Sequence, residues 1–298
     1  MPGEAQASLA SGLYLVATPI GNLGDITLRA LEVLRGADRI ACEDTRVTQK
    51  LLNHFQIETP TVSCHEHNER QRARELLAAL EAGGRIALVS DAGMPGISDP
   101  GAWLVSGAIA AGVPVIPIPG ANAALSALIA SGLPTGAFTF LGFLPEKAGA
   151  RRTQLEALAA EASKAAAPRT LIFYEAPHRI LDTLMDLELV WGPELRVAVA
   201  RELTKVHEEF LRGAIASVRQ QLALRERTRG EITLLVEPPA QASTPPAATH
   251  EPVAARLARV QAETGGSERE ALKRLARELG QSKSDLYREL QRERARQR

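Results

Sequence analysis

This 298-residue chain has few cysteines and no long uninterrupted apolar segment, and both features limit the class of protein to which it can belong. Cys42 and Cys64 are its only cysteines, and their separation does not match the spacing of a metal-binding pair. We therefore expect both thiols to be small core residues of a reduced, cytoplasmic protein, with a disulfide or a redox pair as the alternative.

The sequence also lacks a membrane span and a secretion signal. The apolar stretch 113–133 is interrupted by Pro114, Pro117, Pro119 and Gly120, and it falls short of the ~18 consecutive apolar residues that a spanning helix needs. The first ten residues contain no basic segment followed by an apolar one. We therefore expect a soluble chain with no membrane partner. Its 298 residues, 45% of them hydrophobic, are sufficient for two compact domains.

Phosphate-binding motifs are missing too. The loop ATPIGN at 17–22, after the first expected strand, has neither the G-x-G-x-x-G of a dinucleotide fold nor the G-K-[ST] of a phosphate loop. Pro19 removes a backbone donor from this loop. A cationic or zwitterionic cofactor therefore fits better than a phosphate-rich one. S-adenosylmethionine is a natural candidate of that kind, although the charge argument does not select it.

The segment LVSDAGMPGISDPG at 88–101 is the most informative in the chain. It closes an apolar strand and contains three glycines, two prolines and two aspartates, Asp91 and Asp99. Glycine allows a backbone to approach a ligand closely, and aspartates at the carboxyl end of a strand offer anionic acceptors. The segment predicts a ligand-binding loop, and a long surface loop is the alternative.

Strand-like and helix-like segments alternate along the first part of the chain. The runs LYLVA, RIACE, RIALVS and VPVIPIP are each followed by a stretch of helical period, such as 69–84, which predicts a parallel sheet with helices on both faces. The runs FTFLGFL, RTLIFYE, RVAVARE, EEFLRG and EITLLVE predict a second α/β domain with mixed strand pairing.

The C-terminal region has a different character. Residues 238–252 are rich in proline and small residues, which is typical of an extended linker. Residues 253–298 contain 12 Lys or Arg against 7 Asp or Glu, whereas the whole chain has no net charge. Ser267 and Glu270 form a capping-box pattern, so we expect a basic helical module that resembles a helix-turn-helix; a helical docking module is the alternative.

Many separate motifs then share one resemblance: ATPIGNLGDITLRALEVL, EDTR, HEHNE, LVSDAGMPGISDPG, IPGANAAL, GFLP, LIFYEAPHR, VARELTK and GEITLLVE. Together, over about residues 13–237, they resemble the tetrapyrrole (corrin/porphyrin) methylase superfamily. Within it they are most similar to the bacterial 16S rRNA cytidine 2′-O-methyltransferases, whose C-terminal helical module the tail also resembles.

The resemblance implies two α/β domains of tetrapyrrole-methylase type, 13–120 and 121–237, with S-adenosylmethionine in the cleft between them. A flexible N-terminus (1–12), the linker (238–252) and the helical module (253–298) complete the organisation. The implied enzyme is a homodimer that methylates the ribose of a cytidine in the decoding centre of 16S rRNA, in the small ribosomal subunit. A methylase of a small tetrapyrrole and a noncatalytic RNA-binding protein remain as alternatives.

The resemblance also assigns cofactor contacts. The Gly-Asp-Pro turn of the superfamily falls on residues 90–92, where two of its three residues differ, so the individual contacts of Ser90 and Ala92 stay open. Pro119 and Gly120 could instead form a simple strand-to-helix turn, and Tyr174, beside Phe173 at a strand end, could be a core aromatic. The expected cofactor residues are Pro19, Asp91, Gly93, Pro95, Gly96, Ser98, Pro119, Gly120, Ala121, Tyr174, Ala200 and Ile232.

Methylation of a hydroxyl needs a proton acceptor, for which a carboxylate or a lysine in the cleft is suited. We expect Glu175 and Lys205 in catalytic roles, with Glu202 behind them. A structural ion pair of Glu175 with Arg201 or Arg179 is the alternative.

Basic side chains near the expected cleft predict RNA contacts. The pair His65 and His67 could suggest a metal, but no third ligand follows at a suitable spacing, so no metal is expected. The expected RNA-binding residues are Arg46, Lys147, Arg151, Arg152, His178 and Arg179.

Overall fold

The computed structural model describes residues 9–65, 68–163 and 167–239, together with residues 257, 260, 261, 271–273, 275, 276, 286 and 290. The chain divides into two compact units, Met1–Ala240 and Gln241–Arg298. The predicted capping box at Ser267 and Glu270, most of the predicted linker and residues 1–8 lie outside the described residues.

The first sheet of the larger unit contains five strands in the order β3-β2-β4-β1-β5. All of its strand pairs are parallel, as the alternation of strands and helices predicts. Four of the strands coincide with the predicted apolar runs, and the three-residue strand β3 was not predicted. The bounds are β1 (Gly12–Val16), β2 (Arg39–Cys42), β3 (Thr61–Ser63), β4 (Arg85–Leu88) and β5 (Val115–Ile118).

Helices cover both faces of this sheet, as predicted. Side chains alternate across a strand, so Leu13 and Tyr14 of β1 point to opposite faces. Tyr14 belongs to a core that includes residues of α1 (Leu28–Gly36) and α2 (Thr45–His54). Leu13 belongs to a second core with residues of α3 (Glu69–Glu81) and α4 (Ala102–Ala110).

Both cysteines are core residues. Cys42 is wholly buried in the core beneath α1 and α2, and Cys64 lies in the core beneath α3 and α4. Both are free thiols, which confirms the expectation from their spacing and excludes the disulfide between them in this structure. Burial raises the pKa of Cys64 to about 11, so its thiol stays protonated at neutral pH.

The second sheet has the order β6-β7-β10-β8-β9 and is mixed, as predicted. Only β6 and β7 pair in parallel, whereas β10 is antiparallel to both β7 and β8, and β8 is antiparallel to β9. The bounds are β6 (Phe138–Phe143), β7 (Thr170–Glu175), β8 (Arg196–Arg201), β9 (Glu209–Ala214) and β10 (Ile232–Glu237).

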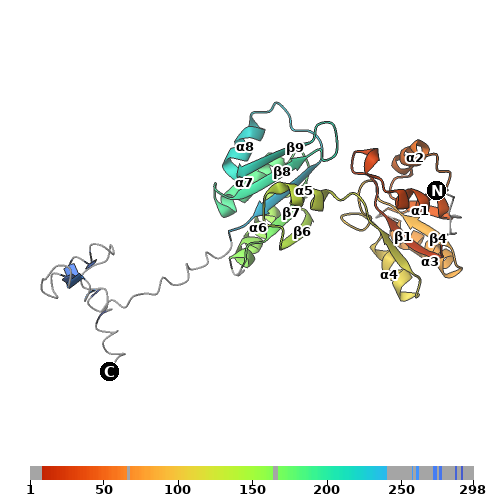
Figure 1. Ribbon diagram of the computed structural model, residues 1–298, viewed down its shortest axis with the longest axis horizontal. Coiled ribbons are helices and arrows are strands. Elements are labelled where there is room, and N and C mark those ends of the chain that lie inside the picture. Colours follow the sequence, from red (N-terminus) through yellow and green to blue (C-terminus); the bar gives the residue numbers. More distant parts are fainter. Residues whose placement is uncertain are drawn as a thin grey trace, which may run out of the picture. The chain divides into compact units, whose positions relative to one another are not determined.

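Three helices pack on one face of this sheet and one on the other. Residues of α6 (Ala148–Ala162), α7 (Ile180–Trp191) and α8 (Ile215–Ala223) share a core with Phe173, which is wholly buried. On the opposite face, α5 (Ala123–Ser131) contributes Ala127 and Leu128 to a core with Ala200. Figure 1 shows α5 beside the strands of this sheet. Ile20, from the loop after β1, also belongs to this core and so connects the two halves of the unit.

The smaller unit has a hydrophobic cluster of its own. Among its described positions, buried side chains pack together in one cluster that comprises Leu257, Val260, Ala271, Leu272, Leu275, Ala276, Leu286 and Leu290. Several of these positions are helical, in agreement with the expected helical module. Within the part of the chain that the structure describes, no helix is both long and apolar enough to span a membrane.

Candidate functional site

A cavity of about 390 Å³ lies where loops of the first sheet meet strand ends of the second. Its walls come from the loops after β1 and β4, from the start of α5, and from residues near the ends of β6, β7 and β8 and the beginning of β10. Ile232 pairs with both Glu175 and Arg201, so the start of β10 lies at the same sheet edge as the ends of β7 and β8. This antiparallel register brings residues 174, 200 and 232 to one place.

The loop after β4 is held against the loop after β1. Thr18 and Gly93 exchange two backbone hydrogen bonds, of 2.8 Å and 3.0 Å, and the Thr18 hydroxyl donates to the Ser90 carbonyl at 3.2 Å. Gly93 has a φ of +82°, which a residue with a Cβ adopts only with strain. At position 120 a glycine is needed because there is no room for a side chain: a Cβ there would lie 2.9 Å from the Cβ of Ala17.

The structure brings part of the predicted cofactor set to the cavity wall. Five of its members line the cavity, namely Gly93, Ser98, Tyr174, Ala200 and Ile232. Six of the other seven are near the cavity but are not part of its wall. Pro95 and Gly96 lie in the same loop after β4. The other four lie close in sequence to the lining residues Ile20 and Asn122, namely Pro19, Pro119, Gly120 and Ala121. The seventh, Asp91, is exposed and accepts a hydrogen bond from the backbone N–H of Asp44 at 3.0 Å, so its carboxylate connects the loops after β4 and β2.

Tyr174 packs against other aromatic residues and also lines the cavity. Its ring packs edge-on against Phe140 and Phe143, at centroid distances of 4.9 Å and 5.8 Å, and it also lines the cavity. Phe173 beside it points to the other face of the sheet and is wholly buried in the core. Of the two residues left open in the turn, Ala92 lines the cavity and Ser90 is buried behind it.

The cavity is acidic. Its lining residues include the acidic Asp99, Glu175 and Glu231 and no lysine, arginine or histidine. Burial, together with the nearby carboxylates of Glu43 and Asp91, raises the pKa of Asp99 to about 6. Asp99 is thus ionised at neutral pH in surroundings that disfavour its charge, and a positively charged ligand would relieve that cost.

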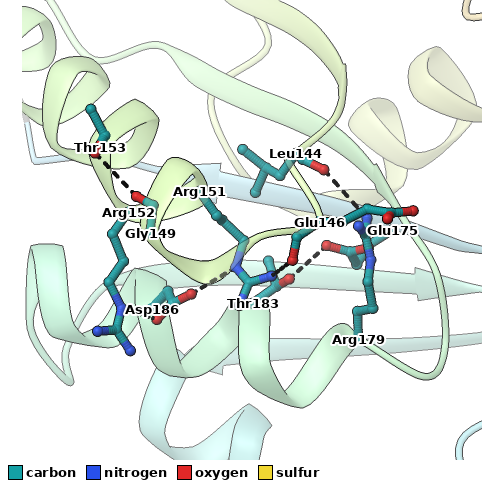
Figure 2. Close-up of polar contacts among 10 residues, drawn as sticks. All are labelled: Leu144, Glu146, Gly149, Arg151, Arg152, Thr153, Glu175, Arg179, Thr183 and Asp186. Carbon is teal, nitrogen blue, oxygen red and sulfur yellow. Dashed lines mark hydrogen bonds and ion pairs between the residues drawn. The ribbon is translucent and has the colours of Figure 1, made fainter.

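The carboxylate of Glu175 is fully engaged inside the protein, as Figure 2 shows. One oxygen accepts hydrogen bonds from Arg179 at 2.6 Å and from the backbone N–H of Ala176 at 2.7 Å, and the other accepts from the Thr183 hydroxyl at 2.6 Å. The Glu175 side chain is fully buried. A carboxylate fixed by an arginine is poorly suited to accept a proton. The structure contains the ion pair with Arg179 that the sequence left open as the alternative to a catalytic role of Glu175.

Lys205 is also paired. Its Nζ lies 2.7 Å from Glu202 and 3.1 Å from Glu231, which itself lines the cavity. Partial burial lowers the pKa of Lys205, but the hydrogen bonds to the two glutamates outweigh it, so the pKa is raised overall. A protonated lysine cannot act as a base, and the observed interaction of Lys205 at this site is its ion pair with Glu231.

Two of the predicted RNA-binding arginines are held in ion pairs inside the protein. Arg151 is buried and its Nε donates to Asp186 at 2.7 Å, while Arg179 is held by Glu175. Neither guanidinium is available to a phosphate. Arg152 is half exposed and also bonds Asp186, at 2.6 Å. The remaining predicted residues, Arg46, Lys147 and His178, are exposed.

Several lining residues were not predicted from the sequence. They include Ile20, Met94, Ile97, Asn122, Phe143 and Thr233. Most are sequence neighbours of predicted residues, so the motifs indicate the right segments but not which side chains face inward. His67 lies outside the described residues. Within the described ones, no group of three or more His, Cys, Asp or Glu is arranged to hold a metal ion.

One α/β half with a parallel sheet, one with a mixed sheet and an acidic cavity at their strand ends agree with the class of protein that the sequence predicts. Residues 12–219 match the tetrapyrrole (corrin/porphyrin) methylases, and the chain belongs to this family. It is an S-adenosylmethionine-dependent methyltransferase, as expected.

Relatives of the chain agree with this family assignment. It is 50% identical over 280 residues to the ribosomal RNA small subunit methyltransferase I of Halalkalibacterium halodurans, over 92% of this chain and 93% of the relative. The protein of the same name from Synechocystis sp. is 59% identical over 203 residues, covering 68% and 71% of the two chains.

A solved structure shows the same fold. The uroporphyrin-III C-methyltransferase of Thermus thermophilus, complexed with S-adenosylhomocysteine, is 19% identical and has a TM-score of 0.51, over 75% of this chain and 96% of that chain. At this identity the likeness concerns the fold alone.

Proposed function

We propose that this protein methylates the ribose 2′-oxygen of a cytidine in the decoding centre of 16S rRNA. The observation that carries the proposal is the 50% identity, over nearly the full length of both chains, to a protein named ribosomal RNA small subunit methyltransferase I. The cytidine and the 2′-oxygen are proposed because the sequence motifs resemble those of the bacterial 16S rRNA cytidine 2′-O-methyltransferases. The partner is accordingly the small ribosomal subunit.

The acidic cavity fits S-adenosylmethionine. This cofactor carries a sulfonium and an ammonium group against a single carboxylate, and the cavity offers Asp99 and Glu231 without a competing basic side chain in its wall. We propose that Gly93, Ser98, Tyr174, Ala200 and Ile232 contact it and that the loops carrying the other predicted residues shape the cavity around it. When bound, the cofactor supplies an activated methyl group.

Alignment is the main task left to the protein. Holding two reactants in a reactive geometry contributes up to about 7 to 11 kcal/mol, whereas a general base contributes a factor of roughly 10² to 10⁴. With Glu175 and Lys205 engaged in ion pairs, Asp99 is the lining carboxylate that has no arginine or lysine bound to it in the described structure. Since its pKa is about 6, Asp99 is ionised at neutral pH, where it can face a positive group or accept a proton.

Methyl transfer to small subunits tests the proposal. The protein is incubated with methyl-labelled S-adenosylmethionine and unmodified small subunits, and the rRNA is then hydrolysed with alkali. A 2′-O-methyl group blocks cleavage at its own phosphodiester, so one missing band at a cytidine of the decoding centre is expected. Label incorporated elsewhere in the rRNA would contradict the choice of nucleotide. Label transferred only to a free tetrapyrrole would contradict RNA as the substrate.

We also propose that the protein acts as a cytoplasmic homodimer. Light scattering of the purified protein tests the dimer, for which the expected mass is twice the 31.9 kDa of one chain. A monomer at micromolar concentration would contradict it.

A further inference from the structure

A second hollow, the basic groove, adjoins the acidic cavity. It has a volume of about 440 Å³, and its walls come from the turn after β7, from α7 and α8, and from residues 225–230, which connect α8 to β10. Pro177 and Gly230 line both the basic groove and the acidic cavity, so the two hollows share part of their walls. A ligand in the groove therefore lies next to the proposed cofactor site.

The charge of the groove is opposite to that of the cavity. Its walls carry Arg225, Arg227, Arg229 and His178, with Glu226 as their one acidic side chain. Within the described structure, the side chains of Arg227 and Arg229 make no hydrogen bond or ion pair, and both residues are exposed. Two guanidinium groups without partners thus face the same hollow, and both can bind an anion.

The segment that carries these arginines is anchored. The guanidinium of Arg225 binds the carboxylate of Glu209, with one hydrogen bond of 2.8 Å, and Arg201 donates to the Arg229 carbonyl at 3.1 Å. At its end, Gly230 has a φ of +90° and packs so closely on Glu202 that a Cβ would overlap that side chain. The segment is held at both ends, so its backbone needs little further ordering when the two arginines bind a ligand.

We propose that the basic groove binds the phosphate backbone of the RNA substrate, with Arg227 and Arg229 as the principal contacts and His178 at its rim. The inference rests on the proposed function, because it names the surface that holds the same substrate. Arginine forks match phosphate oxygens, and phosphate contacts fix the position of a nucleic acid without reading its sequence. The groove would place a nucleotide at the shared wall, where its ribose can reach the acidic cavity.

The opposite charges of the acidic cavity and the basic groove direct the methyl donor and the RNA phosphates to different sites. The acidic cavity favours the cationic methyl donor and disfavours phosphate, whereas the groove does the reverse. The groove also replaces Arg151 and Arg179, which the sequence suggested for RNA and which the structure holds in buried ion pairs.

The test is the full-length double variant Arg227→Gln/Arg229→Gln. Its matched control is Arg29→Gln/Arg39→Gln, which removes the same charge from exposed arginines that line neither hollow. Methyl transfer to unmodified small subunits is measured at varied subunit concentration, and binding of a short single-stranded oligoribonucleotide is followed by fluorescence anisotropy at several salt concentrations. Calorimetry with S-adenosylmethionine checks the cofactor site and the folding of each variant.

We expect the groove variant to raise the KM for subunits and weaken oligoribonucleotide binding about ten-fold or more, and to reduce the salt slope of binding by about one per lost phosphate contact. Cofactor affinity should not change, and Arg227→Lys/Arg229→Lys should recover part of the binding. Equal values for the groove variant and the control would overturn the proposal, as would a wild-type protein that binds no RNA. If the wild type binds RNA through the groove but transfers no methyl group to subunits, the proposed function fails and the groove stands.

Discussion

Glu175 and Arg179 form a buried ion pair of 2.6 Å at the edge of the acidic cavity. Glu175 ends β7 and Arg179 precedes α7, so the pair fixes the turn that separates the strand from the helix. Arg179 also donates to the Leu144 carbonyl at 3.4 Å, which ties the loop after β6 to the same point (Figure 2). The pair therefore holds three segments of the second half of the enzyme around the site.

Removing the charge of Glu175 should destabilise the protein. In Glu175→Gln the guanidinium of Arg179 loses its carboxylate in a buried position, which typically costs about 3 to 5 kcal/mol. Urea unfolding measures the change. The control is Glu237→Gln, which breaks the more exposed pair with Arg196 and should cost under about 1 kcal/mol. Unchanged stability with a large loss of turnover would return Glu175 to a catalytic role.

The two arginines on Asp186 offer a matched comparison. Arg151 is buried and Arg152 is half exposed, although both donate to the same carboxylate. We expect Arg151→Met to lower the free energy of unfolding by about 2 to 3 kcal/mol and Arg152→Met by under about 1 kcal/mol. Denaturant unfolding of both variants tests this. Equal and small effects, joined to a higher KM for RNA in Arg151→Met, would show that Arg151 contacts RNA after all.

Gly230 should resist substitution more strongly than Gly83. Both have a similar positive φ, +90° and +87°, so alanine meets the same backbone strain at either site. A Cβ at position 83 meets open space, whereas at position 230 it overlaps Glu202. Strain alone costs about 1 to 2 kcal/mol, and overpacking adds typically 1 to 3 kcal/mol. Thermal unfolding should therefore give Gly230→Ala a lower melting temperature than Gly83→Ala, and the reverse order would contradict the close packing of Gly230 on Glu202.

Cofactor affinity should depend on pH through Asp99. Its pKa is raised to about 6, so below that pH the free cavity holds a neutral carboxyl group. A cationic ligand favours the ionised form, so binding releases a proton there, and affinity should fall by up to about ten-fold per pH unit below pH 6. Calorimetry between pH 5 and 7 measures this dependence.

Two variants give the pH experiment its controls. Asp99→Asn should bind S-adenosylmethionine more weakly at pH 7 and lose the dependence between pH 5 and 7. Asp182→Asn removes an exposed carboxylate of α7 that is not part of the cavity and should behave as the wild type. A wild-type slope retained in Asp99→Asn would assign the titration to another group.

Local patterns were sufficient to predict most of the fold. Nine of the ten strands in the described residues coincide with predicted apolar runs, and the pairing is parallel in the first sheet and mixed in the second, as predicted. The second sheet nevertheless has helices in three of its four connections, and only β8 and β9 are joined without one. The three residues of β3 are too few to show a period, so this strand depends on its pairing with β2. The order of strands in each sheet depends on contacts between distant segments and was not predicted.

The site was predictable by segment but not by side chain. Glycines and prolines at 93–101 indicated the ligand loop because these residues have specific backbone geometry. The ion pair of Arg151 was not predicted because a sequence shows the charge of an arginine but not its partner, and Asp186 is 35 positions from Arg151. Arg179, Thr183 and Asp186 recur at helical spacing, which was the available signal for a buried polar face. Residues 225–230 were missed because their motif is only a short run of charges.

The most direct test of the account is a crystal structure of the protein with S-adenosylmethionine. We expect the donor to occupy the acidic cavity between Gly93 and Ile232, with its sulfonium or ammonium group facing Asp99 or Glu231. A donor bound elsewhere on the chain, or an acidic cavity that stays empty at saturating donor concentration, would contradict it.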